Sequence, residues 1–335
     1  MTDVRNVDRT AEALLHQLWQ IGWDADSVGR PWHTYRTWTS ARREWPIENR
    51  TRKVHLRVAY DGDRPVGWAE ARLPLLDNLH LAMLDVFVHP EDQRRGHGSA
   101  LLVALSDILR EEGRTTALLE VAAPVAAASG PLLFARAQGF AVAQQDEMKV
   151  ADLRETASSW APLLASTEAV AVGYQLLTWS GACPDHLVDA YCELASRFIA
   201  EIPLGDLAME PEVWDRARLR ENEERQRLAG RSDVTTIVLG PDGTGVGYTE
   251  MMVAEERPDL AYQGATIVLP GHRGHRLGQR LKATNHLAFT RAHPGARNVI
   301  TGNASENVHM NAINDQLGFR VVERCLEMQR TTVGL

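Results

Sequence analysis

The sequence predicts an α/β protein built from two copies of one domain, each with a mixed, twisted sheet and helices on both faces. The main observation is an internal repeat: residues 66–70, VGWAE, return 180 positions later as VGYTE at 246–250. The same offset relates Val88-His89-Pro90 to Val268-Leu269-Pro270. A second observation is that strand-like and helix-like patterns alternate in the same order in both halves, as in an α/β fold.

The repeat also indicates the domain boundary. Gly139-Phe140 returns as Gly318-Phe319 with an offset of 179, so each copy extends to a similar distance beyond its motifs. A chain of 335 residues is long enough for two domains, each with its own core. We therefore expect domains at residues 1–155 and 156–335, joined by a connector rich in Ser, Thr and Ala at 154–169.

The first copy begins with an amphipathic helix at 11–21 and a tryptophan-rich segment at 32–45. Alternating apolar residues predict strands at 54–60 and 66–73, joined by a turn at 61–65. The remaining elements, in order, are a strand at 84–88, a glycine-rich basic loop, a helix at about 99–112, a buried strand at 117–121, a short helix at 131–137 and a strand at 141–150.

The second copy repeats this order with one more helix near its start. Pro241-Asp242-Gly243 is a turn signal between two alternating apolar segments, which predicts a hairpin. The predicted elements are a strand at 172–179, helices at 184–198 and 210–228, strands at 234–239, 246–253 and 265–269, a second basic loop, a helix ending near 291, a strand at 298–302, a helix at 307–316 and a strand at 319–329.

Composition excludes several classes of partner. A net charge of −8 argues against nucleic-acid binding, which takes a dominant basic surface. No apolar stretch approaches the roughly 20 residues that span a bilayer, and the N-terminus lacks the apolar core of a signal peptide. An odd number of cysteines, Cys183, Cys192 and Cys325, fits a reducing compartment. We expect a cytoplasmic protein with no nucleic-acid or membrane partner.

Two basic, glycine-containing loops lie where a strand passes into a helix. Residues 93–98, QRRGHG, occupy this place in the first copy, and residues 273–278, RGHRLG, in the second. Backbone N–H groups at a helix N-terminus have no intrahelical partner, and the helix dipole favours an anion there. The loops therefore predict a cradle for a pyrophosphate, with a purely structural turn as the alternative.

The pattern Val88-x-Pro90-x-x-Gln93-x-x-Gly96-x-Gly98 resembles the acetyl-CoA pyrophosphate loop of the GNAT acetyltransferase superfamily. Gly139-Phe140 resembles a later motif of that family, and the resemblance covers nearly the whole chain in two units. It implies two tandem GNAT-like domains, similar in architecture to mycothiol synthase. The matching residues of the second copy are Pro270, Arg273, Gly278, Gly318 and Phe319.

The resemblance implies acetyl-CoA as the cofactor and direct attack of an amine on its thioester. A carboxylate then removes the amine proton, and a tyrosine often protonates the leaving thiolate. The residues expected to contact CoA in the first copy are Val86, Phe87, Val88, Gln93, Arg94, Arg95, Gly96, His97 and Gly98. Those expected in the second are Ile267, Val268, Leu269, Arg273, Gly274, His275, Arg276, Leu277, Gly278, Asn303 and Asn307.

The copies depart from the family pattern in different ways. Arg276 stands where the first copy has Gly96, and it either pairs with a CoA phosphate or marks a degraded site. At the position of the family's tyrosine the first copy has Ala135 and the second has Asn314, which we take as a candidate catalytic residue. The leaving thiolate is then protonated by a water or by another side chain, or it leaves without the help of an acid.

We favour the second copy for catalysis. It keeps polar residues around Asn303, Asn307 and Asn314, whereas residues 121–128 of the first copy are almost featureless. Asn307 matches a family asparagine that bonds the cofactor arm, and capping of the following helix is the alternative. Glu250 is the candidate general base and should be partly buried if it has that role; a surface glutamate is the alternative. The first copy would then bind CoA or act as scaffold.

The function that fits best is an N-acetyltransferase that moves an acetyl group from acetyl-CoA to a primary amine of a small molecule. The alternatives are a retired CoA-binding or structural protein, and a protein or peptide N-acetyltransferase. The histidines lack zinc-like spacing with other ligands, so no metal site is expected. The tryptophans of the first half are expected to pack in a core or an interface. The protein is expected to be a monomer or a homodimer.

Overall fold

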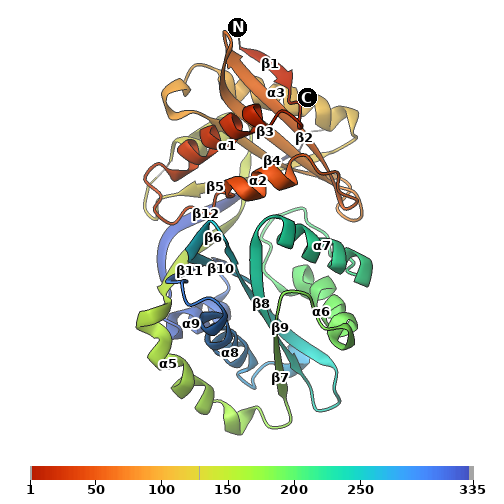
Figure 1. Cartoon of the computed structure of the whole chain (residues 1–335), viewed down its shortest axis with the longest axis vertical. Helices are drawn as coiled ribbons and strands as arrows, with labels where there is room; N and C mark the ends of the chain where they lie inside the picture. Colours follow the sequence, from red (N-terminus) through yellow and green to blue (C-terminus); the bar gives the residue numbers. More distant parts are fainter. Residues whose placement is uncertain (1, 128, 332–335) are drawn as a thin grey trace. The chain divides into compact units, whose positions relative to one another are not determined.

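The computed structural model describes residues 2–127 and 129–331 and divides into two compact units (Figure 1). Unit 1 consists of Met1–Gln145, Gly205–Met209 and Arg324–Leu335, and unit 2 of Asp146–Leu204 and Glu210–Glu323. Each unit therefore contains residues from both sequence copies. A single boundary near residue 155 does not separate the two units. Met1, Ala128 and the final residues 332–335, which the predicted domains include, lie outside the described residues.

Unit 1 is a mixed sheet with helices on both faces. Its strands lie in the order β1-β2-β3-β4-β5-β12, and only β4 and β5 run parallel. The strands are β1 (Asp3–Asn6), β2 (Arg52–Asp61), β3 (Arg64–Pro74), β4 (Leu81–Val88), β5 (Thr116–Ala123) and the end of β12 (Arg320–Thr331). The helices are α1 (Glu12–Ser27), α2 (Trp38–Glu44), α3 (His97–Glu111) and α4 (Gly130–Ala137).

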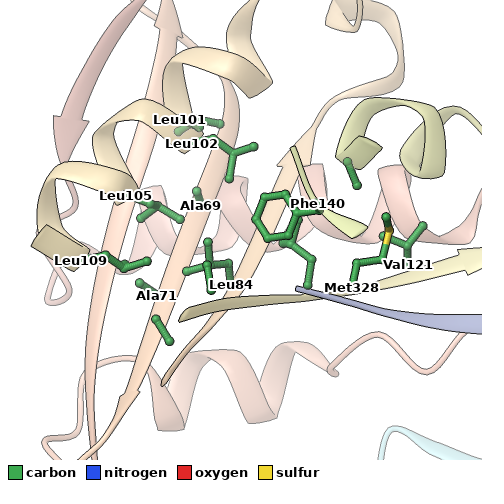
Figure 2. Packing of buried hydrophobic residues seen from close by; sticks show 14 of the residues in the cluster. Ala69, Ala71, Leu84, Leu101, Leu102, Leu105, Leu109, Val121, Phe140 and Met328 are labelled. Carbon is green, nitrogen blue, oxygen red and sulfur yellow. The ribbon is translucent and has the colours of Figure 1, made fainter. Parts of the chain in front are cut away.

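The two faces of this sheet bury different residues. Small and aliphatic residues of β3, β4 and β5 pack beneath the leucines of α3, with Phe140 and Met328 closing the cluster (Figure 2). The other face packs on α1 and α2 through Leu15, Leu18 and Trp68, with several further tryptophans around them. The tryptophan-rich segment therefore forms core, as the packing interpretation predicted.

Unit 2 repeats this architecture. Its strands lie in the order β6-β11-β10-β9-β8-β7, and only β10 and β11 run parallel. The strands are the end of β6 (Ala141–Asp152), β7 (Gln175–Ser180), β8 (Arg231–Leu239), β9 (Gly245–Ala254), β10 (Arg257–Val268) and β11 (Asn298–Ala304). The helices are α5 (Leu153–Ala165), α6 (Val188–Glu201), α7 (Arg216–Leu228), α8 (Leu277–Ala292) and α9 (Val308–Gln316).

Alternation along β9 assigns its residues to the two faces of the sheet. Met251 and Val253 pack with Phe289 of α8 and with Trp160 of α5. Tyr248, on the opposite face, packs with residues of α6 such as Tyr191. Glu250 alternates with Met251 and therefore belongs to the α6 face.

The last strand of each copy completes the sheet of the other unit. Residues 324–331 of β12 pair antiparallel with β5 in the register Arg324↔Ala123 to Thr331↔Thr116. Residues 146–152 of β6 pair antiparallel with β11 in the register Asp146↔Ala304 to Asp152↔Asn298. Leu326 and Met328 thereby enter the core cluster of unit 1. Unit 1 needs the C-terminal strand of the chain to bury its core.

Most elements form where the apolar periodicity places them, with several differences. The helix expected at 210–228 is α7, which begins only at Arg216 because Asp215 caps it there. The segment 154–169, expected to be a connector, is largely helix α5, which Asp152 caps and which buries Trp160. The short strand β1 and helix α2 are not among the elements predicted from the sequence. β10 is also longer than the predicted strand at 265–269. None of the described helices is long and apolar enough to cross a membrane.

Candidate functional site

The two basic loops share one backbone conformation although their glycines stand at different positions. Arg94 and Gly96 have φ of 65° and 89°, and Gly274 and Arg276 have φ of 88° and 54°. All four lie in the left-handed region, where a residue other than glycine is strained by about 1 kcal/mol or more. Each loop therefore has one glycine and one arginine at the two left-handed positions, in opposite order. Arg276 keeps the loop shape that Gly96 has in the first copy.

The residue at position 93 or 273 holds each loop against the end of the preceding strand. Gln93 Nε2 donates to the Val88 carbonyl at 3.2 Å, and Arg273 Nε donates to the Val268 carbonyl at 3.1 Å. Arg273 also forms an ion pair with Glu201 at 2.9 Å. Both side chains, expected to contact the cofactor, therefore brace the loop.

Each loop ends at the N-terminus of a long helix. Ala100 N donates to the Gly96 carbonyl at 3.0 Å, and Arg280 N donates to the Arg276 carbonyl at 3.2 Å. The N–H groups of the three residues before each of these donors have no acceptor within their own helix. Together with the helix dipole, they form an anion site of the kind that binds phosphate. The predicted residues His97 and Leu277 begin these helices.

Gly98 and Gly278 are required by helix packing. A Cβ atom on Gly98 would lie 3.0 Å from the Phe134 ring of α4, and one on Gly278 would lie 2.9 Å from Ile313 Cδ1 of α9. A larger residue at either position requires the facing side chain of the short helix to shift. The sequence argument assigned these glycines to the phosphate cradle, and the structure adds a packing reason for them.

Beside each loop, two parallel strands separate. β4 pairs with β5 from Leu81↔Thr116 to Leu84↔Leu119, and β10 pairs with β11 from Leu260↔Asn298 to Tyr262↔Ile300. The residues beyond these pairs diverge. The predicted cofactor-contacting residues 86–88 lie on the diverging part of β4. Residues 267–268 lie on that of β10, and Leu269 follows directly after it.

Glu250 lies opposite a β-bulge that the first copy lacks. β9 and β10 pair as Met251↔Gln263 and Thr249↔Thr266, so Gly264 and Ala265 together face Glu250. A Cβ on Gly264 would lie 2.9 Å from the Glu250 side chain, so glycine gives the carboxylate its room. In the first copy Glu70 pairs directly with Asp85, without an extra residue. Bulges of this kind re-aim side chains next to active sites.

The surroundings of Glu250 favour its protonated form. The pKa of Glu250 is raised to about 7, mainly by burial and also by the negative charge of Asp233. The hydrogen bond from Tyr191 has the opposite effect and lowers the pKa, but burial outweighs it. Tyr191 Oη donates to Glu250 Oε2 at 3.2 Å. Burial likewise raises the pKa of Asp233 to about 6. A carboxylate with a pKa near 7 can accept and release a proton at neutral pH, as a general base requires.

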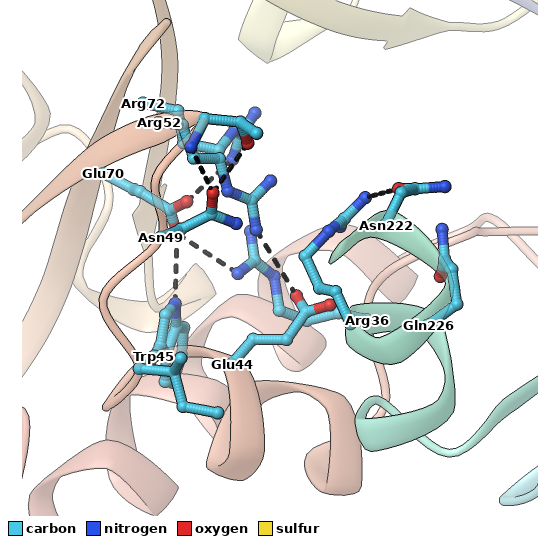
Figure 3. A network of polar contacts seen from close by, with 12 residues as sticks. Arg36, Glu44, Trp45, Asn49, Arg52, Glu70, Arg72, Asn222 and Gln226 are labelled. Atoms are coloured by element: carbon cyan, nitrogen blue, oxygen red, sulfur yellow. Dashed lines mark hydrogen bonds and ion pairs between the residues drawn. The ribbon is translucent and has the colours of Figure 1, made fainter. Parts of the chain in front are cut away.

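The equivalent Glu70 is held as an anion by two arginines (Figure 3). Glu70 is 1% exposed and accepts from Trp45 Nε1 at 3.1 Å and Arg72 Nη1 at 3.0 Å, while Arg36 Nη1 lies 3.2 Å away. Burial alone would raise its pKa, but Arg36 and Arg72 outweigh burial and hold the pKa well below its usual range. Glu70 is therefore a structural anion that cannot take up a proton at neutral pH.

The predicted asparagines have different surroundings. Asn307 Oδ1 caps α9 by accepting from Met310 N at 3.2 Å, which is the capping alternative. Asn314 is fully buried; its Nδ2 donates to Asn303 Oδ1 at 2.5 Å, and its Oδ1 accepts from Lys282 Nζ at 2.5 Å. Asn303 and Asn314, predicted separately, are thus brought together.

Sequence reasoning missed the residues that distinguish the two glutamates. Tyr191 and Asp233 come from α6 and β8, and Arg36 and Arg72 surround Glu70. None lies in a repeated motif. Lys282 was also missed, although a lysine on the apolar side of a predicted helix was a visible signal.

Comparison with known proteins supports the fold. Residues 15–140 match the model of the acetyltransferase (GNAT) family. A tandem GNAT protein from the clavulanic acid biosynthesis pathway, solved without acetyl-CoA, is 26% identical; the match covers 100% of both chains with a TM-score of 0.81. None of the curated proteins matches the sequence.

More distant structures share the fold. A GCN5-related N-acetyltransferase from Sphaerobacter thermophilus is 12% identical over 99% of this chain and 96% of its own, with a TM-score of 0.67. A GCN5-related glucosamine N-acetyltransferase region of a fungal multi-domain β-N-acetylglucosaminidase is also 12% identical. That match covers 98% of this chain and 38% of the fungal one, with a TM-score of 0.67. At this identity the likeness concerns the fold alone.

Proposed function

We propose that this chain acetylates a primary amine of a small molecule and that its second copy carries out the reaction. The chain is a tandem GNAT protein, and the GNAT fold supports acyl-CoA-dependent acetyl transfer. One observation carries the choice of copy. Glu250 has a pKa of about 7, whereas two arginines hold the equivalent Glu70 ionised. Only the second copy therefore has a carboxylate at this strand position that can exchange a proton near neutral pH.

In the proposed reaction the acetyl-CoA pyrophosphate binds at the N-terminus of α8, and its pantetheine arm enters between β10 and β11. Bound acetyl-CoA supplies an activated acetyl group. Glu250 lies at the bulge on the α6 face and takes the proton of the attacking amine. Tyr191 holds the carboxylate in place.

The α6 face suits a cationic acceptor. The ring of Tyr191 lies 5.0 Å from that of Tyr248 and 6.2 Å from that of Trp179, and Asp233 lies close enough to raise the pKa of Glu250. Aromatic rings and carboxylates together attract an ammonium group. An amine that arrives protonated must lose one proton before it attacks, and a base with a pKa near 7 serves this step.

For the first copy we propose binding or scaffolding without catalysis. Its loop shares the backbone conformation of the loop in the second copy, which supports binding of an anion there as well. Its glutamate is committed to ion pairs with Arg36 and Arg72. Acetylation of a protein terminus remains the alternative if peptides react and small amines do not.

Gly96→Asp and Gly274→Asp form a matched pair of tests. Each places a negative charge in one phosphate loop at a left-handed position, where the other copy has an arginine and where a Cβ meets nothing within 4 Å. Acetyl-CoA is titrated calorimetrically into each protein after removal of co-purified CoA, and thiol release is measured with polyamines, amino sugars and peptides. We expect Gly274→Asp to abolish turnover and Gly96→Asp to retain it. Loss of turnover only in Gly96→Asp would move catalysis to the first copy. Absence of acetyl-CoA binding in the folded wild type would overturn the proposed function.

A further inference from the structure

A chain of three polar side chains leads from two buried residues of unit 2, Lys282 and Asn314, to the half-buried Asn303. Lys282 Nζ on α8 donates to Asn314 on α9, and Asn314 Nδ2 donates to Asn303 on β11. Lys282 is 1% exposed and Asn314 is 0% exposed. All donors point the same way, from the ammonium group toward Asn303, and such chains polarise one another. The amide N–H groups of Asn303 have no hydrogen-bond partner among residues 2–127 and 129–331.

The first copy shows that the fold does not require these polar groups. The repeat offset of 180 relates Lys282 to Leu102, and the offset of 179 at the Gly-Phe motif relates Asn314 to Ala135. The sheet registers make Ile300 equivalent to Leu118, and hence Asn303 equivalent to Val121. All three residues of the first copy lie in one apolar cluster, in which Figure 2 labels Leu102 and Val121.

A lysine in this place is costly for the protein. Burial, with a smaller contribution from the charge of Lys149 on β6, lowers the pKa of Lys282 to about 7. Lys149 is itself paired with Glu147 and Asp315, at 3.3 Å and 3.5 Å. His286, one turn along α8, stays neutral because burial and Lys282 lower its pKa to about 3. Since leucine fills the equivalent position in the first copy, packing alone does not explain a buried ammonium group.

The chain ends at the gap between the separating strands. The last pair between β10 and β11 is Tyr262↔Ile300. Asn303 on β11 and Ala265 in the β10 bulge each lie three residues beyond this pair. Asn303 alternates with Val299, which packs against α8, so it belongs to the α8 face. Glu250 belongs to the opposite, α6 face. The candidate base and the end of the chain thus lie at the same level of β10, on opposite faces of the sheet.

We propose that this chain stabilises the thiolate that leaves during acetyl transfer in the second copy, with Asn303 as the hydrogen-bond donor and Lys282 and Asn314 as positioning residues. The inference rests on the proposed function. The amine nitrogen forms a bond to the acetyl carbon, the carbon–sulfur bond breaks, and its electron pair stays on sulfur. Glu250 takes the amine proton, and solvent later protonates the thiolate. Preorganised donors aimed at developing charge are a large source of catalysis.

The main test gives the second copy the apolar residues of the first. Lys282→Leu/Asn303→Val/Asn314→Ala removes all three members of the chain together, so none of them is left without its partner in the chain. The first copy shows that this fold packs those apolar residues. We expect kcat to fall about 100-fold, as for removal of one preorganised donor. KM for acetyl-CoA should change less than about threefold, and the melting temperature should stay the same or rise. Leu102→Met, at the matching position of the first copy, serves as the control and should leave kcat unchanged.

A second variant, Lys282→Met, tests the charge. In the wild type, kcat should decline above pH 7 as Lys282 loses its proton, and this decline should be absent in Lys282→Met. Unchanged kcat in the triple variant, failure of the triple variant to fold, or an identical pH profile in Lys282→Met would each overturn the inference. If the wild type itself turns over no amine, the proposed function fails instead, so the two failures are distinguishable.

Discussion

Replacing Glu250 with glutamine is expected to remove most of the activity. Glutamine keeps the size of the side chain and still accepts the Tyr191 hydroxyl, but it cannot take up a proton. A positioned general base contributes about 10²–10⁴-fold, so kcat/KM should fall by about that factor. In the wild type kcat/KM should rise about tenfold per pH unit below pH 7, because the ionised carboxylate is required and its pKa is about 7. The variant should lack this rise.

The same substitution should stabilise the protein at high pH. Folding raises the pKa of Glu250 from 4.5 to about 7, so the folded state binds the proton more tightly than the unfolded state. Stability due to this group is therefore fully present below pH 4.5 and is lost as pH rises through 7. At about 1.4 kcal/mol for each pH unit between these values, the buried carboxylate costs up to about 3 kcal/mol above pH 7. Glu250→Gln should gain up to that amount at pH 8 and almost nothing at pH 4.

Urea unfolding at both pH values measures the stability effect, and initial rates of thiol release over a range of amine concentrations measure kcat and kcat/KM. Glu70→Gln is the control, because it removes the anion between Arg36 and Arg72. It should lose about 3–5 kcal/mol of stability, while kcat of the folded protein changes less than about threefold. The reasoning is refuted if Glu250→Gln is less stable than the wild type at pH 8, or if its kcat/KM stays within about threefold.

Three further changes probe the loops and the exchanged strand. Arg276→Gly should be as stable as the wild type or up to about 1 kcal/mol more stable in thermal melting, because glycine relieves the left-handed strain. Its acetyl-CoA Kd, measured by calorimetry, should rise about tenfold if the guanidinium pairs with a phosphate. Gly278→Ala should lose about 1–3 kcal/mol, because its Cβ meets Ile313 at 2.9 Å, and denaturant unfolding would contradict this if the midpoint is unchanged. A fragment of residues 1–155 should lack cooperative unfolding, because β5 loses its pairing with residues 324–331; fusing those residues to the fragment should restore it.

The repeat predicts the fold well because local patterns decide which elements form. Glycines, prolines and alternating apolar residues gave almost all strands and helices in order. The exchange of β6 and β12 could not be predicted, because both strands carry the same kind of alternating pattern. Such a pattern fixes which face of a strand is buried, but it does not say which sheet the strand joins. A boundary near residue 155 followed naturally from the linear order and missed this pairing.

The site was predictable only where it lies in the repeated motifs. The loops and the paired glutamates could be placed from the sequence, since both copies carry them at one offset. The protonation behaviour of those glutamates could not, because it depends on side chains brought in from other elements. Arg36 and Arg72 reach Glu70, whereas Tyr191 and Asp233 surround Glu250. The bulge at Gly264 and Ala265 adds one residue to β10, and a gap-free repeat does not reveal it.

Comparison of the two copies indicates that unit 2 has its polar groups for function and not for folding. At the strand position of Glu250 the first copy also has a glutamate, but it surrounds that carboxylate with arginines and so stabilises the anion. At the positions of Lys282, Asn303 and Asn314 the first copy has three apolar residues in a continuous core. Each difference leaves unit 2 with a group whose charged form is unfavourable in the folded state. Proteins retain such costs mainly where activity depends on them. Because both kinds of group lie at the same level of β10, where that strand separates from β11, the proposed reaction accounts for both.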